Sequence, residues 1–171
     1  MRPFLTISAL LLLFLGCSAA ESEISTSTSC SNLTAGALEL GITPAREETP
    51  VFHPIEHNQA IELEFGSQGS WMISFGFRTE APLQTGQPCE IWADLHEFNG
   101  EPIADFYRLV ELNEDESGGR YVLHQFLVLS SSDPVFRVFD WDGKVATFTV
   151  KVKDTCGHEL SHSIPIRLEL P

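Results

Sequence analysis

In the stretch "KVATFTVKVKD", residues 144–154, apolar and polar side chains alternate from Ala146 to Lys153. A period of two is typical of a β-strand that has one face in a core and the other face in solvent. The apolar positions predicted to face inward are Ala146, Phe148, Val150 and Val152. Asp142-Gly143 stands directly before this stretch and predicts a tight turn. The segment therefore predicts a half-buried strand that follows a turn.

The same period recurs along most of the chain from residue 37. "AIELEFG" (60–66) and "SIPIRLEL" (163–170) each place their apolar residues on one face. "CEIWADLHEF" (89–98) runs into Asn99-Gly100, which is a strong hairpin signal. "RYVLHQFLVL" (120–129) and "PVFRVFDW" (134–141) are apolar on both faces and predict further strands. No segment has a helical stripe, so we expect an all-β, immunoglobulin-like antiparallel β-sandwich. The inward side chains expected from the first two segments are Ile61, Leu63, Phe65, Ile164, Ile166, Leu168 and Leu170.

The N-terminus predicts export. Arg2 precedes an apolar run over residues 4–15, which is too short to span a bilayer comfortably and ends at small residues. The following "FLGC" (14–17) resembles a bacterial lipobox, a signal in which the cysteine is diacylated and becomes the first residue of the mature chain. We therefore expect residues 1–16 to be a lipoprotein signal peptide and Cys17 to carry the lipid.

An ordinary signal peptide cut near Ala19-Ala20 is the alternative, and it would make the protein secreted. If Cys17 is lipidated, the protein is anchored in the bacterial cell envelope. Ser18 follows the cysteine, and the lack of an aspartate at this position favours the outer membrane over the inner membrane.

Composition separates a tether from a single domain. Residues 17–36 are rich in Ser and Thr and predict a disordered tether, and residues 37–171 are long enough for one domain with its own core. The chain has 10 Lys and Arg against 24 Asp and Glu, a formal net charge of −14. Such a chain does not attract nucleic acid or an anionic membrane through its own charge. We expect a membrane contact through the lipid, an unknown protein or surface ligand as partner, no nucleic acid and no cofactor.

One stretch matches a zinc-peptidase pattern. His158-Glu159-Leu160-Ser161-His162 fits H-E-x-x-H, in which both histidines lie on one face of a helix. A helix is poorly supported here, because Gly157 precedes the match and Pro165 follows it closely. In an extended chain the two histidine Cα atoms would lie roughly 13 Å apart. We expect a hairpin loop and no metal, with His158 and His162 as weak zinc candidates and a zinc-dependent hydrolase as the alternative.

Acidic loops and tryptophans provide two further candidates. Asp140, Asp142 and Asp154, with the acidic run over residues 111–116, could bind Ca²⁺, but Asp and Gly are also the ordinary residues of tight turns. We expect these residues to form tight turns and not a Ca²⁺ site. An exposed aromatic strip that includes Trp92 would suit a carbohydrate-binding module, although most of the tryptophans are expected in the core.

The cysteine count predicts one disulfide and one free thiol. If Cys17 is lipidated, three cysteines remain in an oxidising compartment. Strands that alternate in direction would place Cys30 at the same end as the 154–158 turn and Cys89 at the opposite end. This favours a Cys30–Cys156 bond, with Cys89–Cys156 as the alternative. No general base is identifiable for Cys89 as a nucleophile.

A family resemblance extends these expectations. "FDWDGKVATFTVKVKDTCG" (139–157) resembles the last strands of PKD-type and other immunoglobulin-like domains of bacterial surface proteins. The chain also resembles a group of uncharacterised bacterial envelope lipoproteins, over about residues 37–170. The segments that carry this second resemblance are "LELG" (38–41), Phe52, "FGSQGSW" (65–71) and "VKDTCG" (152–157). The resemblance implies the fold and the location and supplies no catalytic residues.

These observations together predict a non-enzymatic, lipid-anchored β-sandwich that has a structural or partner-binding role. Loops on a rigid sandwich usually carry recognition. We expect the binding face at one end of the sandwich, formed by the residues Ser67, Gln68, Gly69, Ser70 and His158.

Overall fold

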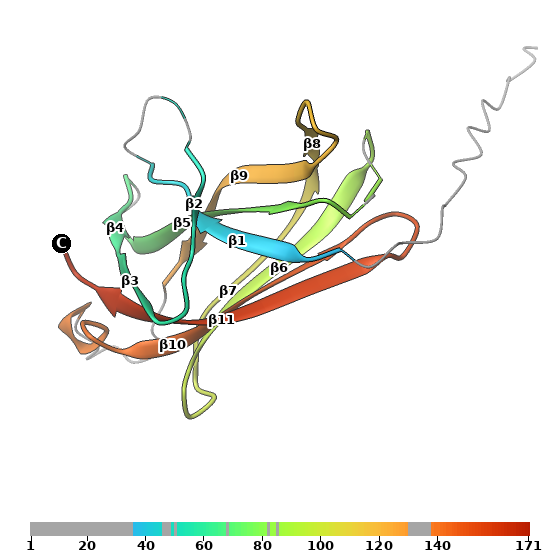
Figure 1. The fold of residues 1–171 in the computed structure, drawn as a ribbon. Helices are drawn as coiled ribbons and strands as arrows, with labels where there is room; N and C mark the ends of the chain where they lie inside the picture. The colour runs from blue at the N-terminus through green and yellow to red at the C-terminus, as the bar shows by residue number, and fades with distance from the viewer. Residues whose placement is uncertain are drawn as a thin grey trace, which may run out of the picture.

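The structure is a computed structural model, and it describes residues 36–45, 49, 51–67, 69–81, 83, 84, 86–129 and 138–171. Two β-sheets form an all-β sandwich, as the sequence predicted (Figure 1). The predicted signal peptide, and the predicted tether up to residue 35, lie outside the described residues. Among the described residues, no helix is long and apolar enough to cross a membrane.

The first sheet, sheet A, has strands that all pair antiparallel. Its strands in spatial order are β2 (His53–Pro54), β1 (Leu38–Ile42), β5 (Trp71–Thr79), β9 (Arg120–Val128) and β8 (Asn113–Glu114). A further short strand, β4 (Glu64–Phe65), pairs with β5 outside this order.

The second sheet, sheet B, contains the long C-terminal hairpin. Its strands in spatial order are β3 (Gln59–Glu62), β11 (Glu159–Glu169), β10 (Val145–Lys153), β6 (Pro88–Glu97) and β7 (Pro102–Glu111). The pair β3–β11 is parallel, whereas the other strand pairs of sheet B are antiparallel, so sheet B is mixed at this edge. No hairpin links these two strands, which are far apart in the sequence, so chain connection does not force them to be antiparallel.

The core lies between the two sheets and follows the predicted alternation. All four inward residues predicted for β10 are at most 1% exposed. Phe75 of sheet A makes edge-on ring contacts with Phe148 and Phe106 of sheet B, at centroid distances of 5.4 and 5.7 Å. Ile166 and Leu168 of β11 are fully buried. The period of two therefore predicted the inward face of the C-terminal hairpin.

Phe65 does not share a face with Ile61 and Leu63, as had been expected. Ile61 and Leu63 are 3% and 1% exposed, whereas Phe65 is 57% exposed. The reason is that the chain changes sheets at Leu63: β3 pairs with β11 in sheet B, and β4 pairs with β5 in sheet A. Phe65 then packs against Trp71, with ring centroids 5.2 Å apart.

The strand predicted over residues 134–141 is wrong in its described part. Val138–Asp140 forms a short 3-10 helix, η1, and residues 134–137 lie outside the described residues. The predicted turn at Asp142-Gly143 is confirmed, since the Lys144 N–H donates to the Trp141 carbonyl at 3.0 Å. Because this turn occupies the chain up to Lys144, the strand β10 starts only at Val145.

Candidate functional site at the Asp154–His158 turn

The turn between β10 and β11 is built around a buried carboxylate. The Asp154 side chain has no exposed surface. Its Oδ1 accepts the backbone N–H groups of Cys156 and His158, both at 2.9 Å. Its Oδ2 accepts the backbone N–H of Gln84 at 3.2 Å and contacts His158 Nδ1 at 3.0 Å. One side chain thus ties the turn to itself and to the segment before β6.

The protonation of Asp154 and the orientation of the His158 ring follow from those contacts. Burial raises the pKa of Asp154, but hydrogen bonds from the His158 backbone, from Gln84 and from the His158 ring outweigh burial and leave the pKa below its usual value. The carboxylate is therefore ionised at neutral pH. A neutral His158 ring then carries its proton on Nδ1, facing Asp154, and leaves Nε2 as an acceptor. The His158 side chain is 19% exposed.

The predicted hairpin loop over residues 158–162 is wrong. β11 begins at Glu159, so only His158 belongs to the turn, and His162 lies within the strand. Backbone pairing with β10 explains the difference, because Lys153 pairs with Glu159 and Val150 pairs with His162. The two histidines are not placed on successive turns of a helix. Among the described residues, no group of three or more His, Cys, Asp or Glu side chains is arranged to hold a metal ion.

Cys89 lies at the turn end of the sandwich, so its predicted place at the opposite end is wrong. β6 and β10 are antiparallel, and Glu90 pairs with Lys153, which puts the start of β6 beside Asp154. Cys89 is a free thiol, 1% exposed, with its sulfur 3.8 Å from the Gln84 carbonyl oxygen. The alternative Cys89–Cys156 bond is therefore not formed.

The environment of Cys89 keeps its thiol protonated. Burial, together with the nearby charge of Asp154, raises the pKa of Cys89 to about 11. A nucleophilic cysteine needs the thiolate form and access to substrate, and Cys89 has neither at neutral pH.

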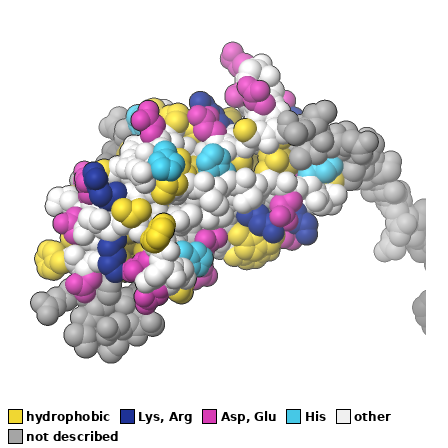
Figure 2. Space-filling view, turned by 60° about the horizontal axis from the view of Figure 1, so that its bottom comes forward, with side chains coloured by type: hydrophobic (Ala, Val, Ile, Leu, Met, Phe, Trp, Pro, Cys, Tyr) yellow, Lys and Arg dark blue, Asp and Glu magenta, His cyan; other side chains and the backbone are white. Residues whose placement is uncertain are grey.

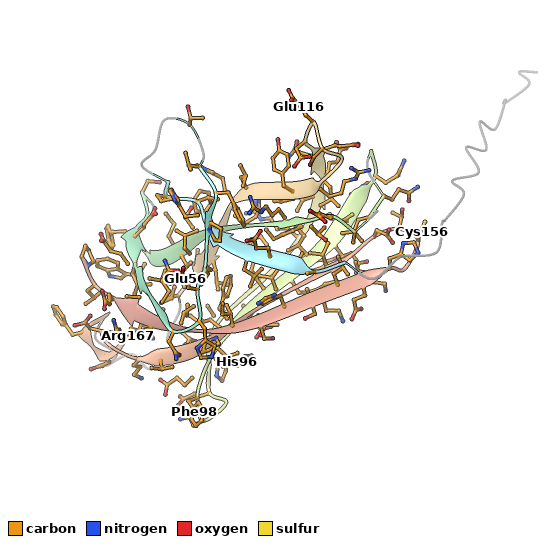
Figure 3. All side chains as sticks on the ribbon, viewed as in Figure 1. Glu56, His96, Phe98, Glu116, Cys156 and Arg167 are labelled. Atoms are coloured by element: carbon orange, nitrogen blue, oxygen red, sulfur yellow. The ribbon has the colours of Figure 1, made fainter. Side chains whose placement is uncertain are left out.

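Cys156 is disulfide-bonded, and its sulfur contacts Gln84 Oε1 at 3.5 Å. Cys17 and Cys30 lie outside the described residues, so lipidation of Cys17 and the Cys30–Cys156 pairing stay predictions. Figure 3 shows Cys156 at the end of the sandwich where β10 and β11 are joined.

The predicted binding loops do not meet. The loop with Ser67, Gly69 and Ser70 joins β4 to β5, and Gln68 lies outside the described residues. The Leu63 N–H donates to the Glu169 carbonyl, which places this loop near the far end of β11, away from His158. The prediction of a shared face is therefore wrong, because β11 runs along the sandwich between the two sites (Figures 1 and 3).

A groove of ≈740 Å³ opens at the turn end of the sandwich. It is lined by residues 36–39 and 78–81, the 115–119 hairpin and His162. Arg78 forms an ion pair with Glu39, and its guanidinium lies 4.8 Å from the centre of the Phe52 ring. The hydrogen bond with Glu39 raises the pKa of Arg78.

Of the residues that line this groove, sequence reasoning singled out His162 and the acidic run that contains Asp115, but it did not predict the contribution of Arg78 and Glu39. The pairing of Arg78 with Glu39 depends on the register between β1 and β5, in which these two residues face each other. Register between strands almost forty residues apart has no local sequence signal, so neither residue stood out. Asp115 was considered only as part of the acidic run over residues 111–116, which was expected to form a turn.

The side chains of Asp115 and Asp142 accept hydrogen bonds that stabilise loops. Asp115 Oδ1 accepts the backbone N–H groups of Ser117 and Gly119, both at 2.9 Å, and the Ser117 hydroxyl at 2.7 Å. These hydrogen bonds lower the pKa of Asp115, and the bond from the Ser117 side chain has the largest effect. Asp142 accepts the Leu170 N–H at 3.1 Å. The two loops lie in different parts of the fold, at the β8–β9 hairpin and before β10, so they do not combine into one Ca²⁺ site.

Trp92 lies on the outer face of sheet B and is half-buried between two neighbours. The Tyr107 ring is 5.4 Å away and tilted by 42°, and Lys151 Nζ lies 5.5 Å from the Trp92 ring centre. Neighbours on both adjacent strands leave Trp92 poorly placed to stack on a sugar. Figure 2 shows a face on which hydrophobic side chains are scattered among acidic, basic and histidine side chains.

No protein family matches this chain, and no curated protein matches it either.

Proposed function

We propose that this protein is a non-enzymatic, lipid-anchored β-sandwich module of the bacterial cell envelope, and that it binds a partner at the end that carries the Asp154–His158 turn. The observation that carries the proposal is a groove lined in part by His162 of β11, the strand that directly follows the turn organised by the buried carboxylate of Asp154. Gly36, the first described residue, also lines this groove. The lipobox-like sequence at Cys17 supports anchoring, and the outer membrane is the favoured location.

Binding accounts for this site better than catalysis does. The Asp154–His158 pair has the form of an oriented base, but a nucleophile or a metal would have to complete it. Cys89, the thiol at this end, is buried and protonated. His162 lies along a strand instead of one helical turn from His158. A zinc-dependent hydrolase therefore has less support than a binding module.

The charges of the groove suggest what kind of partner fits. Glu39, Glu80 and Asp115 line it together with one cation, Arg78, which is already paired with Glu39. The chain as a whole carries a formal net charge of −14. Complementary charge favours a protein surface or other surface ligand that presents Lys, Arg or amine groups. Nucleic acid is disfavoured by the same charge.

Anchoring is tested with Cys17→Ser in the full chain, expressed in a bacterium that processes lipoproteins. We expect the wild-type chain in the membrane fraction and labelled by radioactive palmitate, and the variant unlabelled and released. An unlabelled wild-type chain in the soluble fraction would refute the anchor and favour secretion.

The absence of a catalytic metal is tested on the same purified chain. Zinc and calcium per chain are measured for the wild type and for His158→Ala and His162→Ala. We expect no metal above background in any of the three. Stoichiometric zinc that disappears in both variants would overturn the binding proposal in favour of a metal site.

A further inference from the structure

Among the described residues, the strands at the ends of the two strand orders differ sharply in length. Sheet A ends at β2 and β8, which have two residues each, and sheet B ends at β3, which has four residues. The other end of sheet B is β7, which has ten residues, and the off-path strand β4 of sheet A has two. Short edge strands are a common protection against pairing with another chain, because they offer few free backbone groups. β7 is the long edge that lacks this protection.

The exposed part of β7 also carries apolar side chains. Among the described residues, no strand pairs with the edge of β7 that faces away from β6. Tyr107 is 54% exposed and Leu109 is 60% exposed. Pro102 lies at the very start of the strand, and the segment 105–111 contains no proline. The pairing of β6 with β7 is irregular between Leu95 and His96. Tyr107 and Leu109 pair with β6 in a regular part of the ladder.

Charge along β7 decides which self-pairing is favourable. A pairing centred on Arg108 would place Arg108 opposite its own copy and Asp105 opposite Glu111, so that like charges face each other. A pairing centred on Tyr107 instead places Asp105 opposite Leu109 and Phe106 opposite Arg108. Arg108 already lies 5.7 Å from the Phe106 ring centre within one chain, so cation–π contact suits this pair.

We propose that β7 pairs antiparallel with β7 of a second copy of this chain, across a two-fold axis at Tyr107. The two five-stranded sheets then form one continuous sheet, and Tyr107 and Leu109 lose exposed surface. A two-fold contact is self-complementary, so both copies use the same strand and the assembly closes as a dimer. This inference is independent of the proposed lipid anchor and of the groove.

The dimer is expected to be weak. A single pair of edge strands buries less surface than the roughly 1,200–2,000 Å² of a standard stable interface. The dissociation constant should therefore be micromolar or higher, and dimerisation should depend on protein concentration.

Sedimentation of the purified full-length chain, from micromolar to near-millimolar concentration, tests the proposal. We expect a monomer–dimer equilibrium for the wild type, and a shift to monomer for Leu109→Lys, in which an edge lysine opposes pairing. Phe98→Lys is the matched control, because it removes a side chain that is 92% exposed but lies outside β7. This control should dimerise like the wild type. A wild-type chain that stays monomeric throughout, or a Leu109→Lys variant that dimerises equally well, would overturn the proposal.

Dityrosine coupling tests the register directly. The chain has two tyrosines, Tyr107 and Tyr121. Photo-oxidation with a ruthenium complex and persulfate should give a covalent dimer with dityrosine fluorescence in the wild type. Coupling should persist in Tyr121→Phe and disappear in Tyr107→Phe. Both variants are conservative, so far-UV circular dichroism should match the wild type. Coupling that survives Tyr107→Phe would refute the axis at Tyr107.

Discussion

The two long hairpins of sheet B each have a glycine with positive φ in their turn, but the two turns make very different contacts with the rest of the fold. Gly100 in the β6–β7 turn and Gly157 in the β10–β11 turn both have positive φ, +88° and +81°. In the first turn, the Asn99 side chain accepts only the local Glu101 N–H, at 2.9 Å. In the second, the Asp154 carboxylate is buried and also accepts the Gln84 N–H from a distant segment.

This difference separates local turn chemistry from tertiary structure. The β6–β7 turn presents Phe98, which is 92% exposed, on a hairpin that projects from the body of the molecule (Figure 3). The β10–β11 turn lies against the start of β6 and beside the free thiol of Cys89. A turn that needs only its own residues tolerates change, whereas a turn that organises its neighbours does not.

Replacing Asp154 by Ala should have the largest effect. It leaves the N–H groups of Cys156, His158 and Gln84 without their buried acceptor, and we expect a loss of about 3 kcal/mol in the free energy of unfolding. Asn99→Ala, at the other turn, should cost less than about 1 kcal/mol because its partner can bind water. Urea unfolding followed by circular dichroism measures both. If Asp154→Ala and Asn99→Ala lost equal free energies of unfolding, the two turns would not differ in how they stabilise the fold.

The contribution of Asp154 should also depend on pH. Its folded-state pKa lies below the value of about 3.9 for an unfolded aspartate. The ionised carboxylate therefore stabilises the protein above that value, and the stabilisation is lost as the pH falls through the folded-state pKa. Below about pH 4, wild-type stability should fall more steeply than that of Asp154→Asn, which cannot titrate there. Parallel curves from pH 7 to pH 2 would contradict this.

Sequence reasoning succeeded where the signal is local. The period of two in β10 predicted which of its side chains are buried, and the Asn99-Gly100 and Asp142-Gly143 pairs predicted turns that the structure contains. It failed where the answer depends on which strand lies beside which. Phe65 was predicted to face inward, because nothing near it signals that the chain changes sheets at Leu63.

The candidate site shows the same limit more strongly. Asp154 was seen as a turn residue, but its contact with Gln84 joins segments seventy residues apart. Cys89 was placed at the wrong end, because strand alternation does not reveal that β6 lies beside β10. The Arg78–Glu39 pair of the groove likewise depends on the register of β1 against β5. Sequence patterns drew attention to Asp154, His158 and His162 but did not predict which residues lie beside them.

Replacing either turn glycine should have a smaller effect on stability, and the effect should be the same at the two turns. A Cβ added at Gly100 or Gly157 would meet no atom within 4 Å, so the cost comes from backbone conformation alone. Gly100→Ala and Gly157→Ala should each lose about 1 kcal/mol, because a residue with a Cβ disfavours positive φ. Thermal or urea unfolding checks this. A much larger loss in Gly157→Ala would mean that the Asp154 hydrogen bonds amplify backbone strain at this turn.

Phe98→Ala should have the smallest effect. The ring makes almost no contact with the rest of the chain, so its loss should change the free energy of unfolding by less than about 0.5 kcal/mol. Phe148→Ala is the matched control, because that ring is fully buried and packs against Phe75. It should lose about 3–5 kcal/mol through lost burial and an unfilled cavity. If Phe98→Ala were also strongly destabilising, the β6–β7 hairpin would have to be packed against the body of the molecule in solution. The contrast between a free turn and an anchored one would then no longer hold.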